Sequence, residues 1–162
     1  MSLMDAPVYD EKKEKRRTAL LVLAGLSVLA LVLLFVGGYI AGHGWFFSNL
    51  PAEHKVDKFL TAIEHKDFDT AYGLYVNDPE WKTNLSKHSG YSIKRFTEDW
   101  TTYSKVGEIK SHHVDISRTD GEGFWGTSII VGTTINGSKK FFMSYIRKDG
   151  TLSDYTYHII QY

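Results

Sequence analysis

Three titratable side chains near the C-terminal end could together do acid–base chemistry. Tyr145 and Asp154 are predicted cross-strand neighbours, and His158 falls on the same face of the predicted sheet. Such a group can abstract a proton beside a carbonyl, but four strand residues place Asp154 and His158 roughly 13 Å apart, too far for a direct dyad. A tyrosine hydroxyl satisfied by a carboxylate explains the pattern more simply. The three residues are weak catalytic candidates, and we predict no enzyme.

Other reactive side chains do not combine into a site. The chain contains no cysteine, which removes thiolate chemistry and disulfides. His112 and His113 are adjacent on a predicted strand and point to opposite faces, so they cannot share a metal ion. His54 and His65 fall on one side of a predicted helix, but about 16 Å apart. We predict no metal site and no cofactor, and no phosphate-binding loop or serine nucleophile motif occurs.

Charge argues against a polyanionic partner. The 19 basic residues balance the 19 acidic residues. Five basic and four acidic residues lie in the first 17 positions, so the rest of the chain is close to neutral. Because nucleic-acid binding requires a basic surface, we predict no nucleic-acid partner.

A long apolar segment precedes the predicted sheet. Residues 19–40 carry no charged side chain, and a helix of this length spans about 33 Å, close to the hydrocarbon core of a bilayer. A cleaved signal sequence has a shorter core of ~7–15 residues and a small-residue cleavage site, a pattern that Tyr39 interrupts. We predict a transmembrane helix over residues 18–42. A cleaved signal sequence and a buried soluble helix are the alternatives.

Basic residues before this segment predict its orientation. They occupy positions 12, 13, 15, 16 and 17, whereas the first basic residue after the segment is Lys55. Because cytoplasmic flanks are enriched in Lys and Arg, we predict a cytoplasmic tail over residues 1–17. The C-terminal part is then extracytoplasmic.

Gly38 and Gly42 form a GxxxG pattern at the end of the segment. Small residues at this spacing let two membrane helices pack closely. Glycines at this position also loosen a helix where it leaves the membrane, and the terminal location favours that second interpretation.

Helical periodicity continues beyond a predicted linker over residues 43–50. Apolar residues recur at helical spacing from Val56 to Ile63. Asp67 and Ser92 have the side chains that cap two further helices, and the last of these is predicted to end near Gly107.

The pattern then alternates as in β-strands. Asn136-Gly137 and Asp149-Gly150 are signals for two-residue hairpin turns. Helices followed by an antiparallel meander predict an α+β fold. We predict one domain over residues 51–162, with three helices packed on a curved four-stranded antiparallel sheet.

The hairpins also predict which residues share a face. Two-residue loops would pair Ile135 with Ser138 and Lys148 with Thr151, which makes both faces substantially apolar. Three helices can cover only one face, so we expect a homodimer mate, a partner subunit or the membrane-proximal segment to cover the other. The predicted interface residues are Trp125, Ile129, Val131, Phe142, Tyr155 and Tyr157.

Residues 56–63 (VDKFLTAI) and 67–72 (DFDTAY), with the order of predicted elements, resemble the NTF2-like (cystatin-like, α+β cone) superfamily. The resemblance covers about residues 50–162 and is closest to small membrane-anchored bacterial members. It implies a location in the bacterial inner (plasma) membrane. The superfamily includes isomerases, dehydratases, transport factors and binding modules, so its fold does not fix a function.

We predict a non-enzymatic, single-pass membrane-anchored interaction module, either an accessory or structural subunit of a membrane complex or a homodimer. One alternative is a small-ligand-binding domain whose cone cavity is lined by Phe96, Trp100 and Tyr103. An isomerase- or dehydratase-type enzyme is the weaker alternative.

Overall fold

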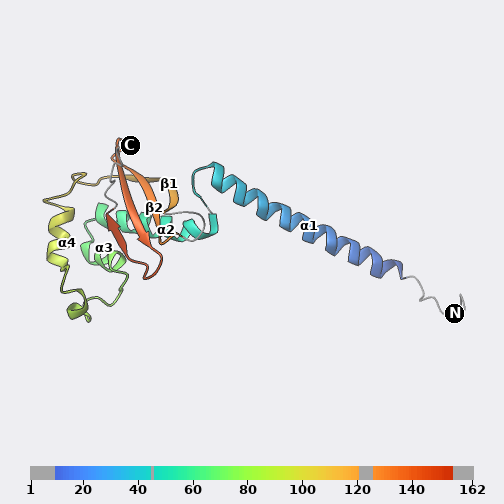
Figure 1. Cartoon of the computed structure of the whole chain (residues 1–162), viewed down its shortest axis with the longest axis horizontal. Coiled ribbons are helices and arrows are strands. Elements are labelled where there is room, and N and C mark those ends of the chain that lie inside the picture. The colour runs from blue at the N-terminus through green and yellow to red at the C-terminus, as the bar shows by residue number, and fades with distance from the viewer. Residues whose placement is uncertain (1–9, 45, 121–125, 155–162) are drawn as a thin grey trace, which may run out of the picture. The chain divides into compact units, whose positions relative to one another are not determined.

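The structure is a computed structural model and describes residues 10–44, 46–120 and 126–154 (Figure 1). It confirms an α+β fold with one long apolar N-terminal helix, further helices and an open four-stranded antiparallel sheet. The chain divides into two compact units, residues 1–37 and 38–162. The elements are α1 (Glu11–Ile40), α2 (Phe46–Glu64), α3 (Phe68–Tyr75), the 3-10 helix η2 (Leu85–His88), α4 (Ile93–Trp100), β1 (His112–Asp120), β2 (Ser128–Ile135), β3 (Lys139–Ile146) and β4 (Leu152–Asp154).

Helix α1 is long and apolar enough to cross a membrane. None of its residues is buried. It begins at Glu11, so the basic residues predicted to form a tail belong to its first turns. The Asp10 carboxylate accepts hydrogen bonds from the backbone N–H groups of Lys12 and Lys13, which caps the helix.

Gly42 ends this helix. The N–H of His43 donates to the carbonyl of Gly38 at 3.0 Å, and the N–H of Gly42 donates to that of Tyr39 at 3.2 Å. Gly42 has a φ of +88°. This is the Schellman geometry, in which a residue without a Cβ adopts the left-handed conformation at the helix terminus. Gly38 and Gly42 therefore do not share one helical face.

Helix α2 lies across the sheet, in contact with β1, β2 and β3. Its buried side is the one that the apolar spacing predicts: Val56, Phe59 and Leu60 are fully buried. The helix begins at Phe46, inside the predicted linker, and Pro51 lies within its N-terminal part.

Helices α3 and α4 begin at the predicted caps. The Asp67 carboxylate accepts from the N–H of Thr70, and the Ser92 hydroxyl accepts from the N–H of Arg95. Helix α4 ends at Trp100, earlier than predicted. Threonines favour helices weakly, and the hydroxyl of Thr101 donates to the carbonyl of Thr97 at 2.6 Å, which competes with helix continuation.

The strand order is β1-β2-β3-β4, with antiparallel neighbours. Asn136 and Gly137 have the positive φ values of the predicted turn, but Ile135 pairs with Lys139. The predicted register of β2 and β3 is wrong by one residue. The Asn136 side chain accepts from the N–H groups of residues 110 and 111 and donates to the carbonyl of Glu108. These long-range contacts hold the turn in a geometry that loop length alone does not predict.

In the observed register, apolar side chains lie together on the face of the sheet that the helices cover. Odd-numbered residues of β2 and β3 share this face, because Ile129 pairs with Tyr145 and Val131 with Met143. The buried apolar residues here are Ile129, Val131, Ile135, Phe141, Met143 and Leu152. We call the opposite side the outer face. It is mixed, with Ile130, Phe142 and Ile146 among Ser128, Thr134, Lys140 and Ser144.

A β-bulge between Val114 and Ile116 changes which residues of β1 face the helices. After it, Ser117 pairs with Val131 on the covered face, and Ile116 pairs with Gly132 on the outer face. A Cβ on Gly132 would lie 2.9 Å from Ile116 and 3.0 Å from Phe142. These two side chains therefore close over Gly132, where no larger residue fits without movement.

Candidate functional site

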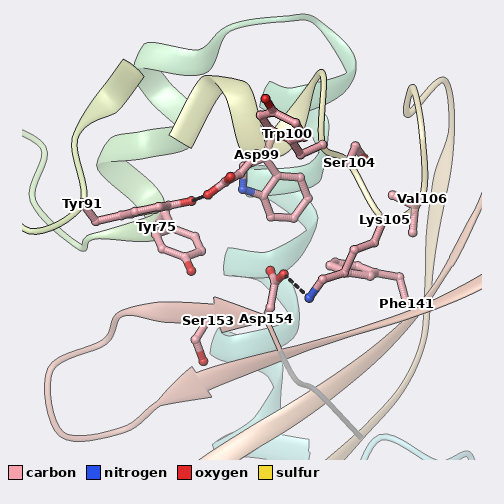
Figure 2. Close-up of a pocket in the computed structure, with 11 residues that line it drawn as sticks. Tyr75, Tyr91, Asp99, Trp100, Ser104, Lys105, Val106, Phe141, Ser153 and Asp154 are labelled. Atoms are coloured by element: carbon pink, nitrogen blue, oxygen red, sulfur yellow. Dashed lines mark hydrogen bonds and ion pairs between the residues drawn. The ribbon is translucent and has the colours of Figure 1, made fainter. Parts of the chain in front are cut away.

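A pocket of about 420 Å³ opens between α4, the loop that follows it, and β4 (Figure 2). Its volume is in the range of small-molecule sites, which is about 300–1,000 Å³. We call it the aromatic pocket. It is lined by Tyr75, Tyr91, Asp99, Trp100, Tyr103, Ser104, Lys105, Val106, Phe141, Ser153 and Asp154.

The protein core fixes the inner wall of this pocket. The Trp100 ring packs edge-on against Phe59, with centroids 4.9 Å apart, and against Phe141 at 5.7 Å. The hydroxyl of Tyr72 donates to the carbonyl of Tyr91 at 2.5 Å, which positions Tyr91 just before α4. The wall is therefore preformed.

Two carboxylates reach the pocket from different elements. Figure 2 shows Asp99 on the helix side and Asp154 on the strand side. The hydroxyl of Tyr91 donates to Asp99 Oδ2 at 2.9 Å, and Lys105 Nζ lies 3.1 Å from Asp154 Oδ2. Each carboxylate thus has one partner within the pocket.

Two tyrosines of the pocket, Tyr75 and Tyr91, remain protonated. Burial is the main cause that raises the pKa of Tyr75 to about 12, and the negative charge of Asp154 adds to it. Burial also raises the pKa of Tyr91, with a further contribution from its hydrogen bond to Asp99. Both hydroxyls therefore serve as hydrogen-bond donors at neutral pH, and neither is a phenolate base.

The predicted catalytic group does not assemble as expected. Tyr145 pairs with Leu152, and Asp154 pairs with Met143, so the predicted direct pairing of Tyr145 with Asp154 is wrong. The carbonyl of Ile146 accepts from the N–H of Gly150, which closes a longer turn than predicted. Tyr145 does not line the aromatic pocket; its ring lies 5.9 Å from Lys55 Nζ. His158 lies outside the described residues.

The predicted interface residues divide between two places. Ile129 and Val131 are buried on the helix-covered face and offer no surface to a partner. Phe142 is half-buried on the outer face. Trp125, Tyr155 and Tyr157 lie outside the described residues.

A polar cluster of three buried residues and the partly exposed His43 joins the segment after α1 to the domain. We call it the His43 cluster: His43, Asn49, Glu53 and Ser117. Glu53 accepts from the hydroxyl of Ser117 and lies 3.0 Å from Nδ1 of His43, and Asn49 donates to the Ser117 hydroxyl at 3.1 Å. The N–H of Ser117 also donates to the carbonyl of Gly42 at 3.0 Å. Ser117 reaches this cluster because of the β1 bulge, which the sequence pattern did not predict.

His112 joins α2 to β1. Its Nδ1 lies 2.6 Å from Glu64 Oε1, and its Nε2 lies 3.1 Å from Asp57 Oδ1. A protonated imidazole can donate to both carboxylates at once. Among the described residues, no group of three or more His, Asp or Glu side chains could hold a metal ion.

Asp78 organises the loop that leads to α4. Its Oδ2 lies 3.0 Å from Nε2 of His88 and accepts from Asn84 at 3.1 Å, while Oδ1 accepts from the N–H of Glu80 at 3.0 Å. The hydrogen bond with His88 is the largest cause that lowers the pKa of Asp78 below its ordinary 3.8. The ionised carboxylate is therefore the form that holds the loop.

This lowered pKa predicts a loss of stability in acid. Stabilisation by Asp78 is complete above the unfolded value of 3.8 and is lost as the pH falls through the lower folded pKa. We expect Asp78→Asn to lower the melting temperature at pH 7, with a difference from wild type that persists down to about pH 4 and shrinks as the pH falls below 3.8. Thermal unfolding of the detergent-solubilised chain at each pH measures this. A constant difference would contradict it.

Comparison with protein-family models, with curated proteins and with solved structures found no match for this chain. The resemblance to the NTF2-like superfamily therefore stays a prediction. The sequence predicted Trp100 and Tyr103 as cavity residues but not Tyr91, Asp99 or Lys105. Phe96, also predicted to line the cavity, is fully buried in the core instead. Tyr91 precedes α4 and Asp99 lies near its end, eight residues later, a separation that no local capping or turn pattern signals.

Proposed function

We propose that the chain is a non-enzymatic, single-pass membrane-anchored interaction module with its NTF2-like domain outside the cytoplasm of a bacterium. The observation that carries the proposal is α1, a continuous apolar helix with exposed Leu and Val side chains along its length. Water solvates such an apolar surface poorly. The helix is stable in lipid, because its backbone groups form hydrogen bonds within the helix. The basic residues at its start support a cytoplasmic N-terminus.

The connection after α1 supports a role that depends on closeness to the membrane. Helix α1 ends at Ile40, and Gly42 already accepts a hydrogen bond from Ser117 of β1. Gly42 is only two residues beyond Ile40, so a membrane-spanning α1 would bring the start of the domain close to the bilayer along the chain. A partner there is most simply another membrane protein or a second copy of this chain.

The proposed contact surface is the outer face near β1. Ile116 is 46% exposed and lies beside Phe142 over Gly132. Strand β1 is an edge strand, and edge strands also offer backbone groups to a partner. This patch is smaller than the one predicted from the sequence, because Ile129 and Val131 are buried on the helix-covered face, whereas Phe142 lies on the opposite face.

The test is to extract the full-length protein from its native membrane in mild detergent and to measure particle mass and co-purifying proteins. We expect an intact N-terminus and a particle larger than the monomer. We also expect Ile116→Lys to dissociate the particle, because a partner would have to desolvate the new charge. Leu85→Lys, at a 60% exposed position on η2, is the matched control. A wild-type monomer would contradict the proposal, and a processed N-terminus would show a signal sequence instead.

A second candidate function is the binding of a small ligand in the aromatic pocket. It is favoured by the preformed wall around Trp100 and by the two carboxylates that converge there. The two functions are compatible, because the pocket and the outer face use different residues.

A further inference from the structure

The aromatic pocket combines two kinds of group that favour positive charge. Its lining includes two carboxylates, Asp99 and Asp154, against one basic side chain, Lys105. It also includes five aromatic rings, those of Tyr75, Tyr91, Trp100, Tyr103 and Phe141. Aromatic faces attract cations through their quadrupoles. Carboxylates attract cations directly and accept their hydrogen bonds.

We propose that the aromatic pocket binds a small organic cation, whose ammonium group lies between Asp99 and Asp154 and faces the aromatic rings. The inference rests on the second candidate function. An anion would be repelled by the negative charge of both carboxylates. A neutral apolar ligand would contact the rings but would desolvate the carboxylates without a partner. Only a cation uses both features of the lining.

The raised pKa values of Tyr75 and Tyr91 agree with a negative electrostatic potential in the pocket. Negative charge on Asp99 and Asp154 contributes to the raised pKa of both Tyr75 and Tyr91, in addition to burial. All four groups line the same pocket, and each carboxylate raises the pKa of both tyrosines. The same potential stabilises a bound cation.

Lys105 is the natural competitor of such a ligand. Its ammonium lies 3.1 Å from Asp154, but its side chain is 66% exposed. Exposed ion pairs of this type contribute little to stability. A ligand ammonium can therefore replace Lys105 at Asp154 while Lys105 moves into solvent. Removal of Lys105 should consequently strengthen ligand binding.

The test is calorimetric titration of the full-length chain in a non-ionic detergent, in phosphate buffer without amines. The probes are choline and its uncharged isostere 3,3-dimethylbutan-1-ol. We expect saturable binding of choline and none of the isostere. Asp99→Asn and Asp154→Asn should each weaken choline binding by about tenfold or more, as loss of a charge-assisted contact does. Lys105→Met should strengthen it by roughly threefold.

Two further variants separate binding from folding and from remote charge. Tyr103 is 70% exposed, so Tyr103→Ala should fold normally and weaken choline binding by about threefold or more. Asp69→Asn removes an exposed carboxylate paired with Lys82 outside the pocket, and should leave affinity unchanged. Near-ultraviolet circular dichroism verifies the fold of each variant.

The possible results separate failure of the cation inference from failure of the ligand-binding function. Equal binding of choline and the isostere, weakened alike by Tyr103→Ala, would overturn the cation inference and leave a ligand pocket in place. Absence of binding by both probes would overturn the cation inference and remove support for the second candidate function. Choline binding that Asp154→Asn does not alter would also overturn the proposed site.

The same chemistry could come from a lipid headgroup or from a free amine. Nanodiscs of phosphatidylglycerol, with and without phosphatidylcholine, distinguish these sources. Weaker binding of free choline when phosphatidylcholine is present would assign the site to the headgroup. Equal binding in both nanodiscs would assign it to a soluble amine.

Discussion

Replacement of Phe59 by alanine is expected to lower the free energy of unfolding by about 3–5 kcal/mol, the range for large buried aromatic residues. Phe59 is fully buried. Its ring contacts Tyr75, Phe96 and Trp100, with centroid distances of 6.0, 6.2 and 4.9 Å. Removal of the ring leaves a cavity among side chains from three helices, and the close-packed core can fill it only in part.

The measurement is urea unfolding of the full-length chain in non-ionic micelles, followed by tryptophan fluorescence. Leu85→Ala is the control, because a 60% exposed leucine contributes less than about 0.5 kcal/mol. The near-ultraviolet spectrum should change as well, since Phe59 supports the Trp100 ring in the wall of the aromatic pocket. A loss below about 1 kcal/mol would mean that Phe59 does not occupy a tightly packed core.

Sequence reasoning succeeded where one physical signal dominated. The length and apolar content of residues 19–40 predicted α1, the spacing from Val56 to Ile63 predicted the buried side of α2, and the side chains of Asp67 and Ser92 predicted two helix starts. Each of these signals is local. None depends on a residue that is distant in the chain.

It failed where distant contacts decide the geometry. The Asn136 side chain makes hydrogen bonds to the segment before β1. These bonds hold a β2–β3 register that differs by one residue from the register that the turn residues alone predict. The bulge before Ile116 likewise turns Ser117 toward Glu53. Because side chains alternate along a strand, each of these single-residue differences moves a whole set of residues to the other face. The predicted interface changed for this reason.

Replacement of Glu53 by alanine is expected to cost about 2–4 kcal/mol, because it leaves buried polar groups without partners. Glu53 is 8% exposed and Ser117 is 2% exposed. The Ser117 hydroxyl would lose its acceptor, and His43 would lose the carboxylate that ties it to α2. Glu53→Gln is the matched control. Its amide oxygen can still accept from Ser117, so we expect a smaller loss of roughly 1 kcal/mol.

This variant also tests whether the segment after α1 is held against the domain. With Glu53 removed, the hydrogen bond from His43 to α2 is lost, and the hydrogen bond from the N–H of Ser117 to the carbonyl of Gly42 remains as the described polar contact between residues 42–44 and the rest of the domain. We expect limited proteolysis around His43 to become faster in Glu53→Ala and to stay close to the wild-type rate in Glu53→Gln. Equal cleavage rates in all three proteins would show that the His43 cluster does not restrain this segment. The contact of residues 42–44 with the domain would then give no support to a partner at the membrane.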